Sequence, residues 1–181
     1  LVAAAIVAAV VVILSVWAWQ RLAAPANAPT QPAAAPAGTR RSVAVLGFKN
    51  LTGRPDTAWL SMALSEMLTT EMSAGGHLRM VSGESVARTK IELSLGDADS
   101  LAKDTLTRLR RSLGTDVVVL GSYTALGKEA GSQIRLDVRL QDTAAGETIG
   151  AISETGTETK LFDLVTHTGA KLRDQLGAGP M

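Results

Sequence analysis

The chain has 181 residues, with 18 lysines and arginines against 17 aspartates and glutamates, 46% hydrophobic residues and no cysteine. This length suits one modest domain with appendages and excludes several large domains. Without cysteine these residues form no disulfide, no thiolate metal site and no lipid-bearing thiol. From Ser42 onward the chain carries fifteen basic and seventeen acidic residues. Because nucleic-acid binders carry a marked positive charge, we expect no nucleic-acid partner.

The first nineteen residues, from Leu1 to Trp19, carry no charge and almost no polar group. As a helix the run would span roughly 28 Å, at about 1.5 Å per residue, close to the ~30 Å hydrocarbon core of a bilayer. Trp17, Trp19 and Arg21 follow the pattern of an interfacial aromatic belt with a snorkelling cation. The sequence therefore predicts a transmembrane helix over residues 1–19, which would give the chain a membrane contact.

The alternative for this run is a secretory signal with Ala-Asn-Ala at residues 26–28 as its cleavage site. Pro29 would follow the cut and no basic leader precedes the run, so we favour a retained anchor. Because the chain opens with Leu inside the apolar run, we expect further residues upstream. Without them the positive-inside rule does not orient the span.

Residues 20–41 are mainly alanine and proline. Their prolines are spaced three or four residues apart and are Pro25, Pro29, Pro32 and Pro36. Such spacing prevents a continuous helix and favours an extended, semi-rigid linker between the span and a domain over residues 42–181. A proline-rich docking peptide is the alternative, although alanine gives a partner's pocket little to grip.

Two patterns of hydrophobicity predict strands in the domain. Short uninterrupted apolar runs predict buried strands at residues 43–48 and 117–120, the first of them buried on both faces, and residues 78–82 are a further short strand candidate. Residues 134–140 alternate apolar side chains with charged ones, which predicts a strand with one solvated face. After a turn at 142–147, a last strand is expected over 148–156.

Helical spacing of apolar residues predicts four helices. The first is capped by Asp56 or Thr57 and stops at Gly75, the second covers residues 84–93, and the last covers 161–176. The third starts at Asp99 or Ser100 and ends before Gly114. Taken in order, these elements predict an α/β fold, with a mixed β-sheet of about five strands and helices packed on it.

Residues 42–53, SVAVLGFKNLTG, resemble the opening strand and Asn-Leu-Ser/Thr-Gly turn of the TolB-like amino-terminal domain, in the group that also holds FlgO and CsgG-type proteins. Blocks at residues 59–68, 109–123 and 134–147 are similar to later parts of that domain, in the same order. The resemblance covers essentially all of residues 42–176. Gly47 stands where the family often has proline, and Ala63 where it more often has glycine.

The resemblance implies a context more than a reaction. Domains of this kind are found in bacterial signalling proteins, between the membrane span that follows a eukaryotic-like serine/threonine kinase and a set of tetratricopeptide repeats. It implies a non-catalytic, membrane-tethered interaction or sensing domain, held by the bacterial inner membrane on its periplasmic side. The alternative is a cell-envelope structural or assembly protein of the TolB, FlgO or CsgG type. Neither the ligand or protein partner nor the oligomeric state follows from the sequence.

Catalytic and metal-binding signals are weak. Ser100 and Lys103 match the Ser-x-x-Lys of penicillin-recognising enzymes, and a small hydrolase using Ser100 is a third hypothesis. The domain is small for that chemistry, so we expect Ser100 to cap a helix instead. His77 and His167 are the only histidines and lie far apart, so we expect no metal, no cofactor and no enzymatic activity in this segment.

The candidate interaction surface consists of polar, charged or aromatic residues at a strand end and on the alternating strand, namely Asn50, Thr52, Trp59, Arg135, Asp137 and Arg139. Each has a simpler structural role as an alternative. Asn50 and Thr52 suit turn-forming hydrogen bonds, and Trp59 suits packing at a helix edge. The three charged residues suit a solvated sheet surface with cross-strand pairing.

Overall fold

The computed structural model describes residues 40–126 and 133–178. The predicted transmembrane helix over 1–19, and the linker up to residue 39, lie outside the described residues. The chain divides into two units, Leu1–Gly38 and Thr39–Met181, and the second contains everything described below. Among the residues described, no helix is long and apolar enough to cross a membrane.

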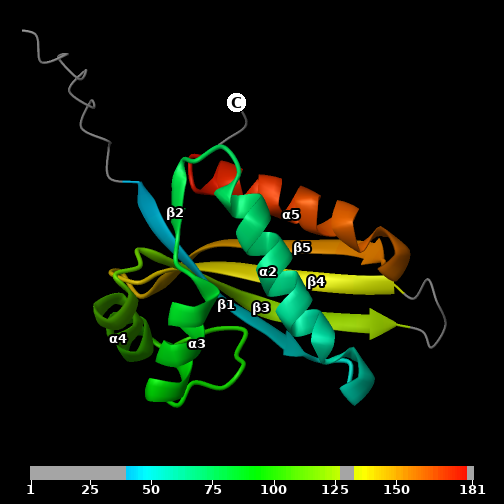
Figure 1. The fold of residues 1–181 in the computed structure, drawn as a ribbon, viewed down its shortest axis with the longest axis horizontal. Coiled ribbons are helices and arrows are strands. Elements are labelled where there is room, and N and C mark those ends of the chain that lie inside the picture. Colours follow the sequence, from blue (N-terminus) through cyan, green and yellow to red (C-terminus); the bar gives the residue numbers. More distant parts are fainter. Residues whose placement is uncertain (1–39, 127–132, 179–181) are drawn as a thin grey trace, which may run out of the picture. The chain divides into compact units, whose positions relative to one another are not determined.

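The described residues form an α/β domain around one five-stranded sheet with the order β2-β1-β3-β4-β5 (Figure 1). β1 pairs in parallel with β2 and β3, whereas β4 pairs antiparallel with β3 and β5. The predicted mixed sheet with packed helices is therefore confirmed. In chain order the elements are β1 (Arg41–Asn50), η1 (Pro55–Thr57), α2 (Trp59–Ser73), β2 (Leu78–Met80), α3 (Gly83–Glu92), α4 (Lys103–Leu113), β3 (Val117–Leu126), β4 (Gln133–Asp142), β5 (Glu147–Thr157), η2 (Glu158–Lys160) and α5 (Leu161–Gln175).

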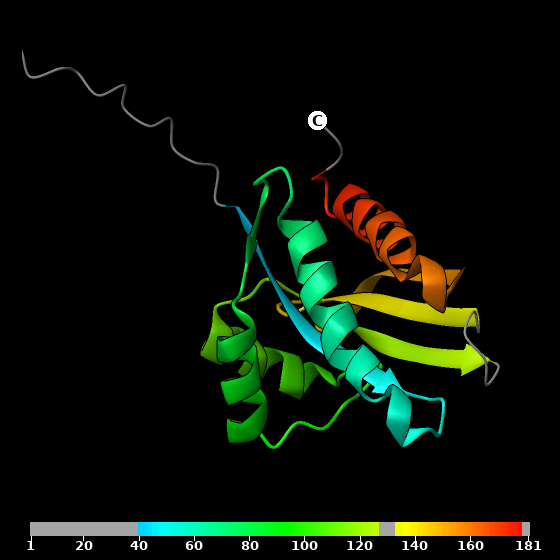
Figure 2. The same ribbon diagram turned by 45° about the vertical axis from the view of Figure 1, so that its right-hand side comes forward.

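β1 and β3 are buried on both faces, as their uninterrupted apolar runs predict. Val43 and Val119 belong to a large core that includes buried residues of α2 and α5. Ala44, Val118 and Leu120 belong to a second, smaller core with residues of α3 and α4. α2 and α5 lie on one side of the molecule, and α3 and α4 lie together beside β1 (Figure 2).

From Gln133 to Leu140, β4 is fully buried on one face only, which confirms the strand predicted from strict alternation. Its apolar residues lie in the large core under α5 and α2, while Arg135 on the opposite face is exposed. Ser153 of the neighbouring strand β5 pairs with Asp137 of β4 and is exposed on the same face. α3 and α4 pack beside β1 and leave this part of the sheet open to solvent.

Two predicted helix starts are wrong. α2 begins at Trp59, not after a cap at residues 56 or 57, because Pro55–Thr57 form a 3-10 turn in which the Thr57 hydroxyl donates to the Arg54 carbonyl at 2.8 Å. α4 begins at Lys103, so Ser100 is not its cap. The buried amide of Gln141 accepts from the Leu101 N–H at 2.9 Å and donates to the Leu101 carbonyl at 3.2 Å. These long-range bonds hold the chain before α4 in a non-helical conformation.

Gly47 lies in a bulge of β1, where the register with β3 shifts between Val45 and Gly47. Its φ is +116°, in the left-handed region that favours glycine. The Lys90 ammonium donates to the Leu46 carbonyl at 3.0 Å and to the Asp97 carboxylate at 2.8 Å, which ties α3 and the following loop to the bulge. Because a proline ring holds φ near about −65°, this backbone does not admit the proline that similar domains often carry here.

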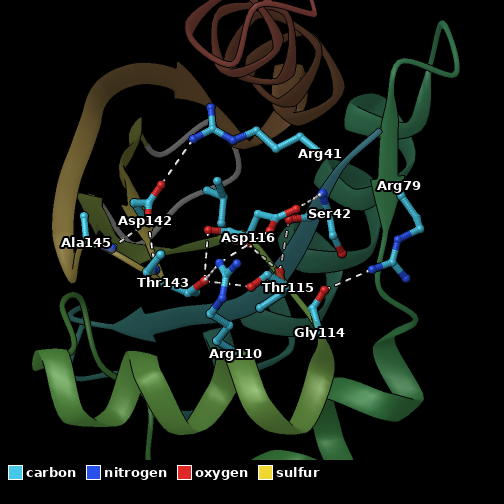
Figure 3. A network of polar contacts seen from close by, with 12 residues as sticks. Arg41, Ser42, Arg79, Arg110, Gly114, Thr115, Asp116, Asp142, Thr143 and Ala145 are labelled. Atoms are coloured by element: carbon cyan, nitrogen blue, oxygen red, sulfur yellow. Dashed lines mark hydrogen bonds and ion pairs between the residues drawn. The ribbon is translucent and has the colours of Figure 1, made fainter. Parts of the chain in front are cut away.

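Polar contacts hold the start of β1 to the start of β3 and to the turn after β4 (Figure 3). The Asp116 carboxylate accepts from the Ser42 N–H at 2.9 Å, and the Asp116 N–H donates to the Ser42 carbonyl at 2.9 Å. The Thr143 hydroxyl donates to the Thr115 carbonyl at 2.7 Å, and Arg110 forms an ion pair with Asp116 at 3.4 Å. Three chain segments are thereby joined where the sheet begins.

Asp142 closes the turn between β4 and β5. Its carboxylate accepts from the Ala144 and Ala145 N–H groups at 2.8 and 2.9 Å and pairs with Arg41 at 3.3 Å. The backbone hydrogen bonds from Ala145 and Ala144, and then the charge and side-chain hydrogen bond of Arg41, lower the pKa of Asp142, while partial burial acts in the opposite direction. The ionised carboxylate is therefore the form that stabilises this turn.

The two faces of β4 predict a large difference between substitutions at adjacent residues. Val138→Asp would bury an unpaired carboxylate, since Val138 is 1% exposed in the large core, and should cost about 4 kcal/mol or more and unfold the domain. Arg139→Gln, on the half-exposed face, should cost less than about 1 kcal/mol. Urea unfolding of both variants checks this, and equal midpoints would mean that the register of β4 is wrong.

Asp142→Asn should make the domain less stable at neutral pH by roughly 1 kcal/mol, because the charge-assisted bonds are lost. Since folding lowers the pKa of Asp142, its contribution is present above the carboxylate's unfolded pKa and is lost as the pH falls through its folded pKa. The difference between parent and variant should therefore narrow below about pH 4. Urea unfolding from neutral to acidic pH measures it, and a constant difference would contradict this account.

Candidate interaction surfaces

The structure places the predicted interaction residues in two groups on opposite sides of the sheet. Asn50, Thr52 and Trp59 lie where β1 ends and α2 begins, on the side of the large core. Arg135, Asp137 and Arg139 lie on the face of β4 that points away from this core. The six residues therefore do not form one site.

Asn50 organises the loop between β1 and α2 with its own side chain. Its amide nitrogen donates to the Arg54 carbonyl at 3.1 Å and to the Thr57 hydroxyl at 3.2 Å, and its amide oxygen accepts from the Thr52 N–H at 2.9 Å. The Thr52 hydroxyl in turn accepts from the Arg54 N–H at 3.0 Å. Asn50 and Thr52 thus use their polar atoms to shape the loop, in the manner of the turn-forming alternative.

Tyr123 on β3 fixes this loop from below. Its buried hydroxyl donates to the Thr57 carbonyl at 2.7 Å, which joins the 3-10 turn to the centre of the sheet. Burial raises the pKa of the Tyr123 hydroxyl, which therefore stays protonated and able to donate. On the outer side of the loop the hydrogen bond from Arg54 lowers the pKa of Asp56.

The fixed loop presents apolar side chains to solvent. Trp59 is 54% exposed and Met62 is 75% exposed on the first turn of α2, three residues apart and so on one helix face. Leu51, in the loop itself, is 48% exposed. We call Leu51, Trp59 and Met62 the β1–α2 corner. The sequence analysis selected only Trp59 of these, although Met62 falls outside the buried stripe of Leu60, Leu64 and Leu68 and could have been recognised.

The second group forms part of an open polar face on β1, β3, β4 and β5. Arg135 pairs with Asp137 at 3.0 Å, and the Ser153 hydroxyl also donates to Asp137. The hydrogen bond from Arg135, with a smaller contribution from Ser153, lowers the pKa of Asp137, against the opposing effect of burial. Arg139 donates to the Asp99 carbonyl at 2.9 Å and so binds the loop before α4.

Strand register places further polar residues in this open face. One row across the strands consists of Lys49 on β1, Ser122 on β3, Asp137 on β4 and Ser153 on β5. Within this row Ser122 is buried. A second row contains Thr124, Arg135 and Thr155. The sequence analysis missed Lys49 and Ser153, because their position beside Asp137 depends on the pairing between strands.

The chemistry available in the described part of the chain is that of surface contact. Exposed aromatic and apolar side chains beside charge-assisted hydrogen bonds are the features with which proteins bind other proteins. Within residues 40–126 and 133–178, no group of three or more His, Asp or Glu residues could hold a metal ion. Ser100 is exposed, and the Gln141 amide reaches its hydroxyl at 3.5 Å.

Comparison of the sequence with protein families decides the family. The profile described as "Curli production assembly/transport component CsgG" matches residues 30–134, which is more than half of the chain. The chain belongs to the CsgG family. The resemblance to the group that holds CsgG-type proteins is thereby confirmed. No curated protein sequence matches the chain.

Several solved structures are similar to this chain. Lipoprotein GNA1162 from Neisseria meningitidis is 16% identical with a TM-score of 0.50, and the match covers 75% of this chain and 98% of that one. The LpoB C-terminal domain from Salmonella enterica is 19% identical with a TM-score of 0.47, over 64% and 82% of the two chains. The PelC dodecamer from Paraburkholderia phytofirmans is 15% identical with a TM-score of 0.47, over 78% and 89%. At such identities the likeness to GNA1162 concerns the fold alone.

Asn50→Ala should loosen the β1–α2 corner, since it removes two donated and two accepted hydrogen bonds inside the loop. We expect a loss of roughly 1–3 kcal/mol in the free energy of unfolding, because loop backbone groups lose their partners. Thr70→Ala, which removes one exposed hydroxyl bond on α2, should change it by less than about 0.5 kcal/mol. Urea unfolding compares the two, and equal stability of both variants would show that Asn50 does not hold the loop.

Proposed function

We propose that this chain acts in the bacterial cell envelope as a non-catalytic domain that binds other proteins of an envelope assembly. The match of the CsgG family over residues 30–134 carries this proposal. The family's description names a component of assembly and transport, which is a role fulfilled by contacts between proteins. The predicted span over residues 1–19 would hold the domain at the membrane, on its periplasmic side.

The arrangement of the two surfaces supports a binding role. Trp59 is the kind of residue that dominates the energy of protein interfaces when it enters a partner's pocket. The loop beneath it is held by Asn50 and Tyr123, so the side chain starts from a fixed backbone and little conformational entropy is lost on binding. The open polar face lies on the other side of the sheet, where it is free to contact a second protein.

The alternative, an accessory domain of a receptor-like serine/threonine kinase, stays a hypothesis. None of the matches described above is to a kinase, and the described residues form the CsgG-type domain alone. The two hypotheses predict different partners. The signalling hypothesis predicts contact with a kinase, and the envelope hypothesis predicts contact with envelope assembly proteins.

Photo-crosslinking in living cells tests the proposal. The full chain, produced in its own bacterium, would carry a benzoyl-phenylalanine at Met62 in the β1–α2 corner, at Ser153 on the open face, or at Arg88 on α3 as an exposed control. We expect reproducible crosslinks to envelope proteins from position 62, position 153 or both, and none from position 88. Trp59→Ala should weaken the crosslink from position 62 at least several-fold, since an anchoring aromatic is removed.

Two results would contradict the proposal. Crosslinks only to cytoplasmic proteins would place the domain in the cytoplasm and not in the cell envelope. Crosslinks to a kinase and to no envelope protein would favour the signalling alternative. Mass spectrometry of the crosslinked bands distinguishes these results.

A further inference from the structure

Five arginines gather at the end of the domain where β1 starts. Arg40 and Arg41 open the domain, Arg79 lies in the middle of β2 beside Ser42, and Arg110 follows on the last turn of α4. Arg111 is the next residue of that turn and is exposed. Arg41, Arg79 and Arg110 reach the start of the sheet from three different elements (Figure 3). We call these five arginines the basic end.

Only part of this positive charge is balanced. Arg41 pairs with Asp142, and Arg110 pairs with Asp116. Arg40 donates to the Gly76 carbonyl at 3.2 Å and Arg79 to the Gly114 carbonyl at 3.0 Å, and neither acceptor carries a charge. Within the described residues no carboxylate lies in ion-pair range of Arg40, Arg79 or Arg111.

The acidic side chains near this end leave three of the arginines without an ion pair. Asp116 and Asp142 are engaged with one arginine each, and the other carboxylates nearby are Glu147, opposite Asp142 on β5, Asp104 in the first turn of α4 and Asp174 near the end of α5. Three exposed guanidinium groups therefore face solvent around the point where the linker joins the domain. A planar guanidinium with several N–H donors suits phosphate oxygens, which it binds through paired hydrogen bonds.

The position of the basic end points to its occupant. The preceding residues are the predicted linker and span, so the basic end is joined directly to the segment expected in the membrane. Even fully extended, at about 3.1 Å per residue, a linker over residues 20–41 reaches no more than ~70 Å. Such a span would keep a lipid surface within this reach of the arginines, and a weak electrostatic contact would gain from the raised local concentration.

We propose that the basic end docks on the anionic phospholipid surface of the membrane that holds the N-terminal segment. This membrane docking rests on the predicted span over residues 1–19 and goes beyond the proposed binding of envelope proteins. β1 has ten residues and leads from Arg41 to Asn50, so at about 3.3 Å per residue the β1–α2 corner lies roughly 30 Å from the docked end. Docking would thus turn the corner that binds proteins away from the lipid.

Energy transfer to labelled lipid headgroups tests this orientation. Because the chain has no cysteine, Ser112→Cys beside Arg111 and Met62→Cys in the far corner each give one labelling site. The labelled full chain is reconstituted into vesicles with about one third phosphatidylglycerol or with phosphatidylcholine alone. We expect transfer from position 112 to exceed that from position 62 several-fold on anionic vesicles. On phosphatidylcholine, or at about 0.5 M salt, the difference should largely disappear because the attraction is screened or absent.

Charge variants test which arginines are responsible. Arg40→Gln, Arg79→Gln and Arg111→Gln together should reduce transfer from position 112 on anionic vesicles to the phosphatidylcholine level. The matched control combines Lys49→Gln, Arg88→Gln and Lys160→Gln, which removes three exposed positive charges elsewhere and should leave the transfer unchanged. Thermal unfolding of both triple variants verifies that they are folded.

Several outcomes would overturn the inference. They are equal transfer from positions 112 and 62, no dependence on anionic lipid, or an equal loss in the two triple variants, which would reflect net charge alone. A different result would support docking but contradict the predicted span. In that case the chain would float only with anionic vesicles, and the basic-end variant would abolish flotation. The crosslinks from positions 62 and 153 are read independently, so the proposed function and this inference fail separately.

Discussion

The burial of β1 and β3 on both faces is the constraint on which the rest of the structure depends. Alternate residues of these strands feed two different cores, so helices are required on both sides of this part of the sheet. α2 and α5 cover one side, and α3 and α4 cover the other. α4 and the loop before it reach only the end of β4, at Arg139 and Gln141, and leave the rest of that face of β4 and β5 uncovered. The open polar face is therefore a direct result of where the second helical layer ends.

The two ends of the sheet differ in chemistry for a related reason. At the start of β1 the chain must be fastened where it enters the domain, and backbone groups near Ser42 and Asp116 are paired through carboxylates, hydroxyls and arginines. At the other end, the bulge at Gly47 and the Asn50 loop redirect the chain into α2. Neutral side chains hold this loop from inside, and Arg54 pairs with Asp56 on its outer side. One end is thus rich in cations, and the other presents Trp59 and Met62.

Most of the fold follows from local patterns in the sequence. The alternation from Ile134 to Leu140 fixes which residues of β4 face the core, and the glycine after α4 ends that helix with φ +60°, as a left-handed cap should. The errors occur where distant residues decide. Gln141 on β4 delays the start of α4, and Tyr123 with Asn50 favours a 3-10 turn before α2. No local propensity could reveal these contacts.

The candidate site was less accessible to sequence reasoning than the fold. Arg135 and Asp137 could be selected because they alternate with core residues, but Lys49 and Ser153 join them only through strand register. Asn50 and Thr52 were selected for being polar at a strand end, and their polar atoms prove to be engaged inside the loop. Side chains that shape a surface and side chains that contact a partner look alike until their hydrogen bonds are known.

The size of the exposed apolar area limits how the domain can bind a partner. A stable interface buries about 800 Å² on each partner, and three side chains such as Leu51, Trp59 and Met62 supply only part of this. Binding at the β1–α2 corner would therefore have to extend onto polar surface or act together with a second contact. The predicted membrane anchor would supply such help, because it would confine domain and partner to one surface and raise their effective concentration. Contacts at the β1–α2 corner that are too weak between free proteins would then be sufficient between tethered ones.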